Sequence, residues 1–232
     1  MRLRRAQRFS GRREVAIGLG VYAVYLGVRR AVFHEEGRAK AARNAQRLIA
    51  LERRLGIHVE PACQRACLQR RRLLACLNLG YVTLNVLLTV GSLTRLYRAR
   101  HPDFHRLRRA AALATLGAQP SFLLFPTAPP RMVDGFVDTV RLHSGIDLDG
   151  RIVSQLYDPI AAMPSIHLAY AVVTAAAVAQ TTCRRPVRAA ARAYPPAVLA
   201  AVVATANHYL LDGLAGAALG AVSLRLARRL RW

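Results

Sequence analysis

The chain has 232 residues, of which 53% are hydrophobic, and its 35 basic residues outnumber the 12 acidic ones, for a formal charge of +23. The arginines flank uncharged blocks instead of lining one basic face. This pattern argues against nucleic-acid binding and favours positively charged loops beside anionic lipid. The blocks show almost no polar stripe, which also argues against the core of a soluble helical protein.

The N-terminal part of the chain predicts a basic head followed by a membrane helix. Residues 1–14 are rich in arginine, and an apolar span follows near 15–33. Because no small-residue cleavage site follows Val28, we expect this helix to be retained and not removed as a signal peptide.

The next segment, residues 34–72, alternates apolar and charged positions at helical spacing. One predicted face carries three leucines, Leu48, Leu51 and Leu55. We therefore expect an amphipathic helix that lies at the membrane interface, with a turn at Gly56 and Pro61.

Uncharged blocks of about 20 residues predict the remaining membrane spans. In chain order they lie near residues 73–94, 110–125 and 163–182, with a fifth that ends near Ala206 and a sixth over about 209–226. We expect basic loops at 95–109 and 184–192, and a polar loop at 126–162. Gly216 and Gly220 form a GxxxG pair, which permits close helix packing.

The expected fold is therefore all-α: an integral membrane six-helix bundle with an interfacial amphipathic helix. We divide the chain into a basic cytoplasmic N-terminus (1–14), a first membrane helix plus the interfacial helix (15–72), and a catalytic membrane core (73–232).

Arginine counts predict how the bundle is oriented. With the N-terminus inside, 20 arginines fall on the inner side, in segments 1–14, 95–109, 183–193 and 225–232. The 126–162 loop carries three, so the positive-inside rule predicts an extracytoplasmic site in a multi-pass cell-membrane protein. Residues 29–72 carry 12 basic residues and should also lie outside, which runs against the rule unless they pair with lipid phosphates.

The sequence predicts no metal and no cofactor. The four cysteines include no CxxC pair and no metal-binding set, so we interpret them as small buried residues. The 126–162 loop holds five aspartates, Asp134, Asp138, Asp147, Asp149 and Asp158. A cation site is one interpretation of these aspartates, but we favour a solvated loop whose acids balance Arg141 and Arg151.

Candidate catalytic residues sit at the ends of the apolar blocks. His208 and Asp212 lie one helical turn apart within an otherwise uncharged run, where ionisable groups are costly to bury. An imidazole held by a carboxylate is a good nucleophile toward phosphorus, and a second histidine, His167, can act as general acid. Ser165, before a probable helix start, and Arg131 are candidate phosphate ligands.

Three motifs carry a resemblance to a known family. Phe125-Pro126-Thr127-Ala128-Pro129-Pro130-Arg131, Ala162-Met163-Pro164-Ser165-Ile166-His167 and Asn207-His208-Tyr209-Leu210-Leu211-Asp212 resemble the signature motifs of the type 2 phosphatidic acid phosphatase superfamily. The resemblance covers about residues 40–226 and is strongest to the branch of the inositol phosphorylceramide synthases and their actinobacterial relatives, whose pattern Leu51-Glu52-Arg53-Arg54-Leu55-Gly56-Ile57 also resembles.

The resemblance implies a six-helix membrane core, with His208 as nucleophile, His167 as acid, Arg131 as phosphate ligand and Asp212 as the residue that orients His208. The chain lacks the lysine of the first motif and the arginine that precedes the third. Fewer cationic ligands favour a transferase over release of inorganic phosphate.

The predicted function is phosphoryl transfer on a phosphorylated lipid, by a lipid phosphatase or an inositol-phosphotransferase-like enzyme. One alternative is an isoprenoid or lipid diphosphate phosphatase or a related diphosphate enzyme, and another is a non-catalytic lipid carrier, against which the intact His167, His208 and Asp212 argue. The expected partners are the lipid substrate and membrane lipids, with no nucleic acid. The lipid, the acceptor and the oligomeric state stay open.

Overall fold

The computed structural model describes residues 9–144, 155 and 157–230, and the protein is all-α within these ranges. Its α-helices are α1 (Gly11–Val32), α2 (Glu35–Arg54), α3 (Glu60–Leu68), α4 (Arg71–Leu79), α5 (Asn85–Arg98), α6 (Phe104–Leu124), α7 (Thr139–Ser144), α8 (Ile166–Thr181), α9 (Arg185–Ala204) and α10 (Leu210–Arg229). A π-helical turn, Gly80–Leu84, joins α4 to α5, and a 3-10 helix covers Pro130–Met132.

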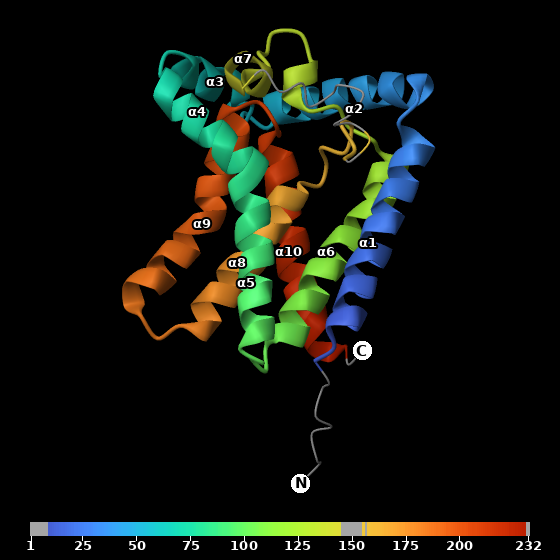
Figure 1. Cartoon of the computed structure of the whole chain (residues 1–232). Coiled ribbons are helices and arrows are strands. Elements are labelled where there is room, and N and C mark those ends of the chain that lie inside the picture. The colour runs from blue at the N-terminus through green and yellow to red at the C-terminus, as the bar shows by residue number, and fades with distance from the viewer. Residues whose placement is uncertain (1–8, 145–154, 156, 231–232) are drawn as a thin grey trace.

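The long helices run side by side, and the short ones gather at one end of the molecule (Figure 1). α8 packs against α5, α6, α9 and α10, and α1 packs against α6. α2 crosses the end of the bundle that is remote from both termini, where α3 and α7 also lie. We call this the capped end, and the opposite one the terminal end.

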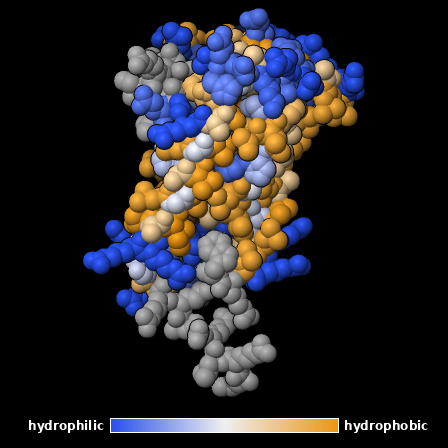
Figure 2. Space-filling model, turned by 90° about the vertical axis from the view of Figure 1, so that its right-hand side faces the viewer, coloured by the Kyte–Doolittle hydropathy of each residue, from blue (hydrophilic) through white to orange (hydrophobic). Residues whose placement is uncertain are grey.

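The surface is consistent with a protein that contacts a membrane. On the face shown in Figure 2, an apolar band separates two hydrophilic ends. Within the described residues, α1 and α10 are long and apolar enough to cross a bilayer, and α8 is a shorter apolar helix. These findings suggest membrane association, while the six-span bundle stays a prediction.

Close packing of α10 on α8 depends on glycine, as the GxxxG pair predicted. A Cβ at Gly216 would lie 2.1 Å from the carbonyl oxygen of Ser165, and one at Gly220 would lie 2.7 Å from that of Ala169. The backbones therefore approach more closely than any side chain permits. This approach brings the first turns of α8 and α10 together.

The interfacial segment forms two helices, with the predicted turn at Gly56, whose φ is +68°. Pro61 is the second residue of α3 and not part of that turn. The three leucines do not share one buried face, since Leu48 is buried but Leu51 and Leu55 are 46% and 56% exposed.

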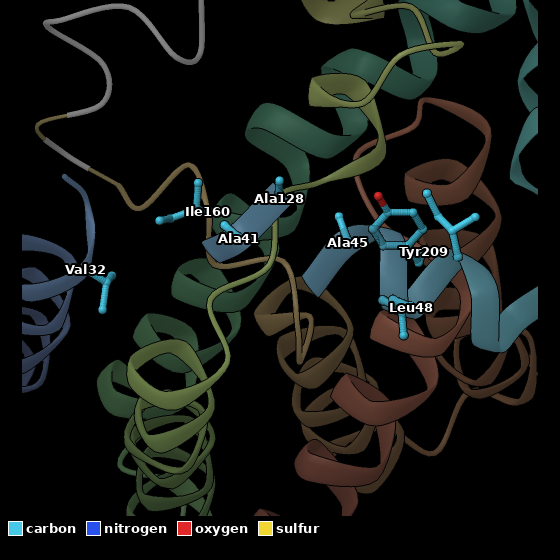
Figure 3. Close-up of a cluster of buried hydrophobic side chains, with 8 residues drawn as sticks. Val32, Ala41, Ala45, Leu48, Ala128, Ile160 and Tyr209 are labelled. Atoms are coloured by element: carbon cyan, nitrogen blue, oxygen red, sulfur yellow. The ribbon is translucent and has the colours of Figure 1, made fainter. Parts of the chain in front are cut away.

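The face of α2 that packs on the protein is formed mainly by small residues. It joins a cluster of buried side chains that reaches α1, the 126–162 segment and the start of α10: Val32, Ala41, Ala45, Leu48, Ile49, Ala128, Ile160 and Tyr209 (Figure 3). This cluster attaches α2 to the backbone that carries the candidate catalytic residues.

The helices extend beyond the predicted spans, so most of the residues in the two predicted basic loops, 95–109 and 184–192, are helical. The segment predicted as a loop at 184–192 is helical from Arg185, and α5 continues to Arg98. The connection between α5 and α6 is therefore short. The end of an apolar block marks where charged residues begin. A helix can continue past that point, because arginine is a good helix former.

Candidate active site

The turn between α9 and α10 positions His208. Its backbone N–H and that of Asn207 both donate to the carbonyl of Val202, at 3.1 and 2.9 Å. Ala206 adopts a φ of 55°, which is unusual for a residue other than glycine and often marks a functional site. The turn reverses the chain so that His208 precedes α10 by two residues, is buried and lines the cavity described below.

His208 and Asp212 are adjacent, as the one-turn spacing predicted. The Nδ1 atom of His208 lies 3.5 Å from Oδ2 of Asp212, which is fully buried. The same oxygen accepts a hydrogen bond of 3.1 Å from the backbone N–H of Tyr209. Because Nδ1 faces the carboxylate, the geometry favours the tautomer with its proton on Nδ1 and a lone pair on Nε2.

The structure brings His167 to the other nitrogen of His208. The Nδ1 atom of His167 lies 3.5 Å from Nε2 of His208, although 41 residues separate them in the chain. The two helix starts are tied together by a 3.0 Å hydrogen bond from the backbone N–H of Ser165 to the carbonyl of Asp212. A phosphorus atom near Nε2 would thus have His167 beside it.

Arg131 lies on the same side, in the 3-10 helix. Its backbone N–H donates to the carbonyl of Ala206 at 2.8 Å, which fixes it to the His208 turn. Its guanidinium donates to the amide oxygen of Asn207 at 3.3 Å and to the hydroxyl of Tyr157 at 3.0 Å. Its Nε lies 3.9 Å from a carboxylate oxygen of Asp138.

Ser165 takes a different position from the other candidates. Its hydroxyl accepts a 3.3 Å hydrogen bond from the backbone N–H of Leu168, as the N-cap of α8, and the residue is fully buried. The structure therefore accounts for Ser165 as a capping residue, and its phosphate contact stays a prediction.

An apolar cavity of about 910 Å³ opens onto these residues. Its walls come from α1, α5 and α6, and one end is lined by Arg131, His167, Asn207 and His208. The other end reaches Glu14 and Arg108, near the terminal end of the bundle. A charged headgroup and an apolar chain could be bound together in such a cavity.

Sequence reasoning missed three residues beside the histidines. The ring of Tyr81 lies 4.5 Å from that of His167, and the side-chain amide of Asn85 donates to the carbonyl of His167 at 3.0 Å. Tyr157 contacts Arg131, as described above. No sequence pattern pointed to Tyr81 or Asn85, because a single tyrosine or asparagine inside an apolar block is common in membrane helices.

Within the described part of the acidic loop, Asp138 has a structural role. Asp138 accepts hydrogen bonds from the backbone N–H groups of Val140 and Arg141 at 3.0 and 2.9 Å, at the start of α7. Asp147, Asp149 and Arg151 lie outside the described residues. Among the residues described, the group whose geometry could hold a metal ion lies elsewhere, at Glu52, His58 and Glu60.

The electrostatic setting of the turn keeps His208 neutral. Burial and the nearby charge of Arg131 together lower the pKa of His208 to about 3. A neutral imidazole with its lone pair toward the cavity can attack an electrophile, and a guanidinium beside it can hold an anion. The arrangement can therefore support phosphoryl transfer.

Comparison with known proteins gives one family. A sequence model of the PAP2 superfamily matches residues 46–226, which includes all three motifs. No curated protein and no solved structure matches the chain. Members of this superfamily are generally phosphatases that act on phosphorylated substrates. Since the match covers most of the chain and both histidines, this protein belongs to the PAP2 superfamily.

Proposed function

We propose that the protein is a membrane phosphoryl-transfer enzyme, a lipid phosphatase or phosphotransferase, that acts on a phosphorylated lipid through His208. The observation that carries the proposal is the meeting of His208, His167 and Arg131 at one end of the apolar cavity. Polar groups converge at that end, while the walls beyond it are apolar.

The cavity supports a lipid as the substrate. Its walls include Val15 and Val21 from α1, Val86 and Val90 from α5, and Ala111 from α6, none of which can bind a polar group. An acyl or isoprenoid chain would bury apolar surface there, at about 25 cal/mol for each Å² removed from water. The phosphate would then lie against Arg131.

In the first step, Nε2 of His208 attacks phosphorus, and the bond from phosphorus to the lipid oxygen breaks. His167, which gains a proton beside the negative charge of the bound phosphate, gives that proton to the leaving oxygen, which departs as the alcohol. Asp212, whose Oδ2 lies 3.5 Å from Nδ1 of His208, stabilises the positive charge that the ring gains. The product of this step is a phosphohistidine at His208.

In the second step, water or an alcohol attacks phosphorus and breaks the bond to Nε2. His167, now neutral, takes the proton of the incoming hydroxyl group, so both histidines return to their starting states. Water yields a phosphatase, and a polyol such as inositol yields a phosphotransferase. The absence of the family's arginine before the third motif supports the transferase, because inorganic phosphate would have fewer cationic ligands.

The decisive experiment is a panel of lipid phosphates and lipid diphosphates, each incubated with the purified protein with and without polyol acceptors. We expect turnover of at least one lipid monophosphate, and transfer to a polyol if the acceptor is an alcohol. His208→Ala must abolish this turnover. Preference for diphosphates alone would favour the diphosphate phosphatase, and binding without turnover would favour a lipid carrier.

We also propose that the capped end faces the extracytoplasmic side of the cell membrane, on the strength of the arginine counts. In a cysteine-free background, Asp134→Cys at the capped end should react with an impermeant maleimide added to intact spheroplasts. Arg188→Cys, which is exposed at the start of α9, should not react. The reverse labelling pattern would place the site on the cytoplasmic side.

A further inference from the structure

The N-terminus of α10 is held by carboxylates that lie far away in the sequence. The backbone N–H of Leu210 donates to Oε1 of Glu60 at 2.7 Å, and that of Leu211 donates to Oε1 of Glu52 at 2.9 Å. Glu52 ends the buried face of α2 and Glu60 begins α3, so they reach α10 from two helices. Both are fully buried.

These bonds complete the capping of the first turn of α10. The N–H of Tyr209, immediately before it, already donates to Asp212. The first backbone N–H groups of a helix have no partner inside the helix, and they carry its positive dipole end. Here Asp212, Glu60 and Glu52 accept from three successive N–H groups, each from a different direction.

The capped turn is the one that carries the chemistry. Asp212 lies on it, and His208 precedes it by two residues, so a rotation of this turn would move Oδ2 of Asp212 relative to Nδ1 of His208. That distance is already 3.5 Å. A small displacement would move the carboxylate farther from the imidazole and weaken their contact, because such contacts weaken steeply with distance.

His58 lies beside the second carboxylate oxygen of each glutamate. Its Nδ1 lies 2.9 Å from Oε2 of Glu60 and 3.5 Å from Oε2 of Glu52. Burial, with the nearby charges of Glu60 and Asp212, raises the pKa of Glu52 to about 8, against the hydrogen bond from Leu211 that lowers it. Glu52 can thus hold a proton at neutral pH while its Oε1 still accepts from Leu211.

We propose that Glu52, Glu60 and His58 form a clamp that positions the first turn of α10, and through it Asp212 and His208, for phosphoryl transfer. The proposal rests on the proposed function for its catalytic part. Glu52 and Glu60 do not line the cavity, so they are positioning residues. Glu52 acts through an oxygen that accepts a hydrogen bond, and its charge is not required.

The test compares three substitutions of Glu52 in the full-length protein in detergent. Glu52→Gln keeps the oxygen that accepts from Leu211, and its amide can donate to Glu60 as a protonated Glu52 would. Glu52→Ala removes the acceptor. We expect Glu52→Ala to lower kcat about 10- to 100-fold, since a misplacement of about 1 Å can cost that much, with KM changed less than about twofold.

Glu52→Gln should restore kcat to within about threefold of the unmodified protein. If Glu52→Ala does not fold, Glu52→Asp replaces it, because its side chain is one methylene shorter and cannot reach Leu211. The matched control is Glu36→Ala, which removes an exposed acid from the same helix and should change neither kcat nor KM.

Hydrogen–deuterium exchange separates this proposal from the proposed function. Glu52→Ala should speed exchange in the peptide that contains Leu210 and Leu211, whether or not the protein proves to be a phosphatase. Faster exchange with unchanged kcat would overturn the positioning role, and unchanged exchange would overturn the clamp. A stoichiometric metal ion, retained by the purified protein and lost in Glu52→Gln, would also overturn it, because the three residues would then be metal ligands.

Discussion

The two ends of the apolar cavity differ in how their buried charged groups are paired. At the terminal end, Glu14 Oε2 lies 3.1 Å from Arg108 Nε, and its other oxygen lies 3.8 Å from Nδ1 of His105. At the capped end, Arg131 donates to the amide oxygen of Asn207 and the hydroxyl of Tyr157, and its Nε lies 3.9 Å from a carboxylate oxygen of Asp138.

The difference separates a structural pair from a reactive site. A carboxylate beside a guanidinium neutralises it, and little charge remains to attract a ligand. Asn207 and Tyr157 orient the guanidinium of Arg131 through an amide oxygen and a hydroxyl, and these groups hold it beside the histidines. Burial of ionisable groups is therefore a poor marker of the site by itself, and the identity of their partners is more informative.

The largest expected effect concerns the two histidines at the capped end. His208→Ala should lower kcat by at least about 10⁴-fold on every substrate, because the attacking atom is lost. His167→Ala should lose about 10²- to 10⁴-fold on an alkyl phosphate, whose leaving oxygen needs a proton. It should recover much of that loss on a p-nitrophenyl ester, whose leaving group needs none.

Steady-state kinetics on both classes of ester checks this prediction. In addition, the His167 variant should accumulate an acid-labile, base-stable phosphoryl label on His208. Equal losses for both variants with both leaving groups would remove the reason to assign the two histidines different roles.

The second prediction concerns the pair at the terminal end and is expressed in stability. Arg108→Met should lower the free energy of unfolding by about 3 kcal/mol, because it leaves Glu14 buried without its main partner. The double variant Glu14→Leu with Arg108→Met should recover most of that loss. Thermal unfolding in detergent, followed by circular dichroism, compares the single variants with the double variant. Strictly additive losses would show that the two side chains are not coupled.

The smallest effect concerns the walls between the two ends. Gly18 of α1 lines the cavity, and a Cβ there would meet nothing within 4 Å, so Gly18→Leu should fill the space where a lipid chain would lie. We expect kcat/KM on a long-chain lipid phosphate to fall about tenfold, which is about 1.4 kcal/mol, with little change on a short-chain soluble phosphate.

Gly20→Leu is the matched control for this substitution, since Gly20 has the same open surroundings but does not line the cavity. Equal kcat/KM values for both variants on the long-chain substrate would place the lipid chain somewhere else.

Local patterns predicted the parts of this protein that depend on neighbours in the chain. The His208–Asp212 pair follows from one helical turn of spacing, and the close approach at Gly216 and Gly220 follows from the absence of side chains. The turn at Gly56 was also predictable, because φ > 0 favours glycine. The buried face of the preceding helix was not, since Leu51 and Leu55 of the predicted face are exposed. The helix ends at Arg98 and Arg185 were not, since charge marks the limit of an apolar block and not the limit of a helix.

By itself, the sequence determined an all-helical chain of the PAP2 superfamily, with its histidines, Asp212 and Arg131 in recognisable motifs. Tertiary structure alone decided that His167 meets Nε2 of His208 and that Glu52 and Glu60 cap α10. The spacing of residues along α2 did not single out Glu52, because helical spacing specifies a face but not what that face contacts. The partners of a buried carboxylate are set by packing between distant segments, and no local pattern records them.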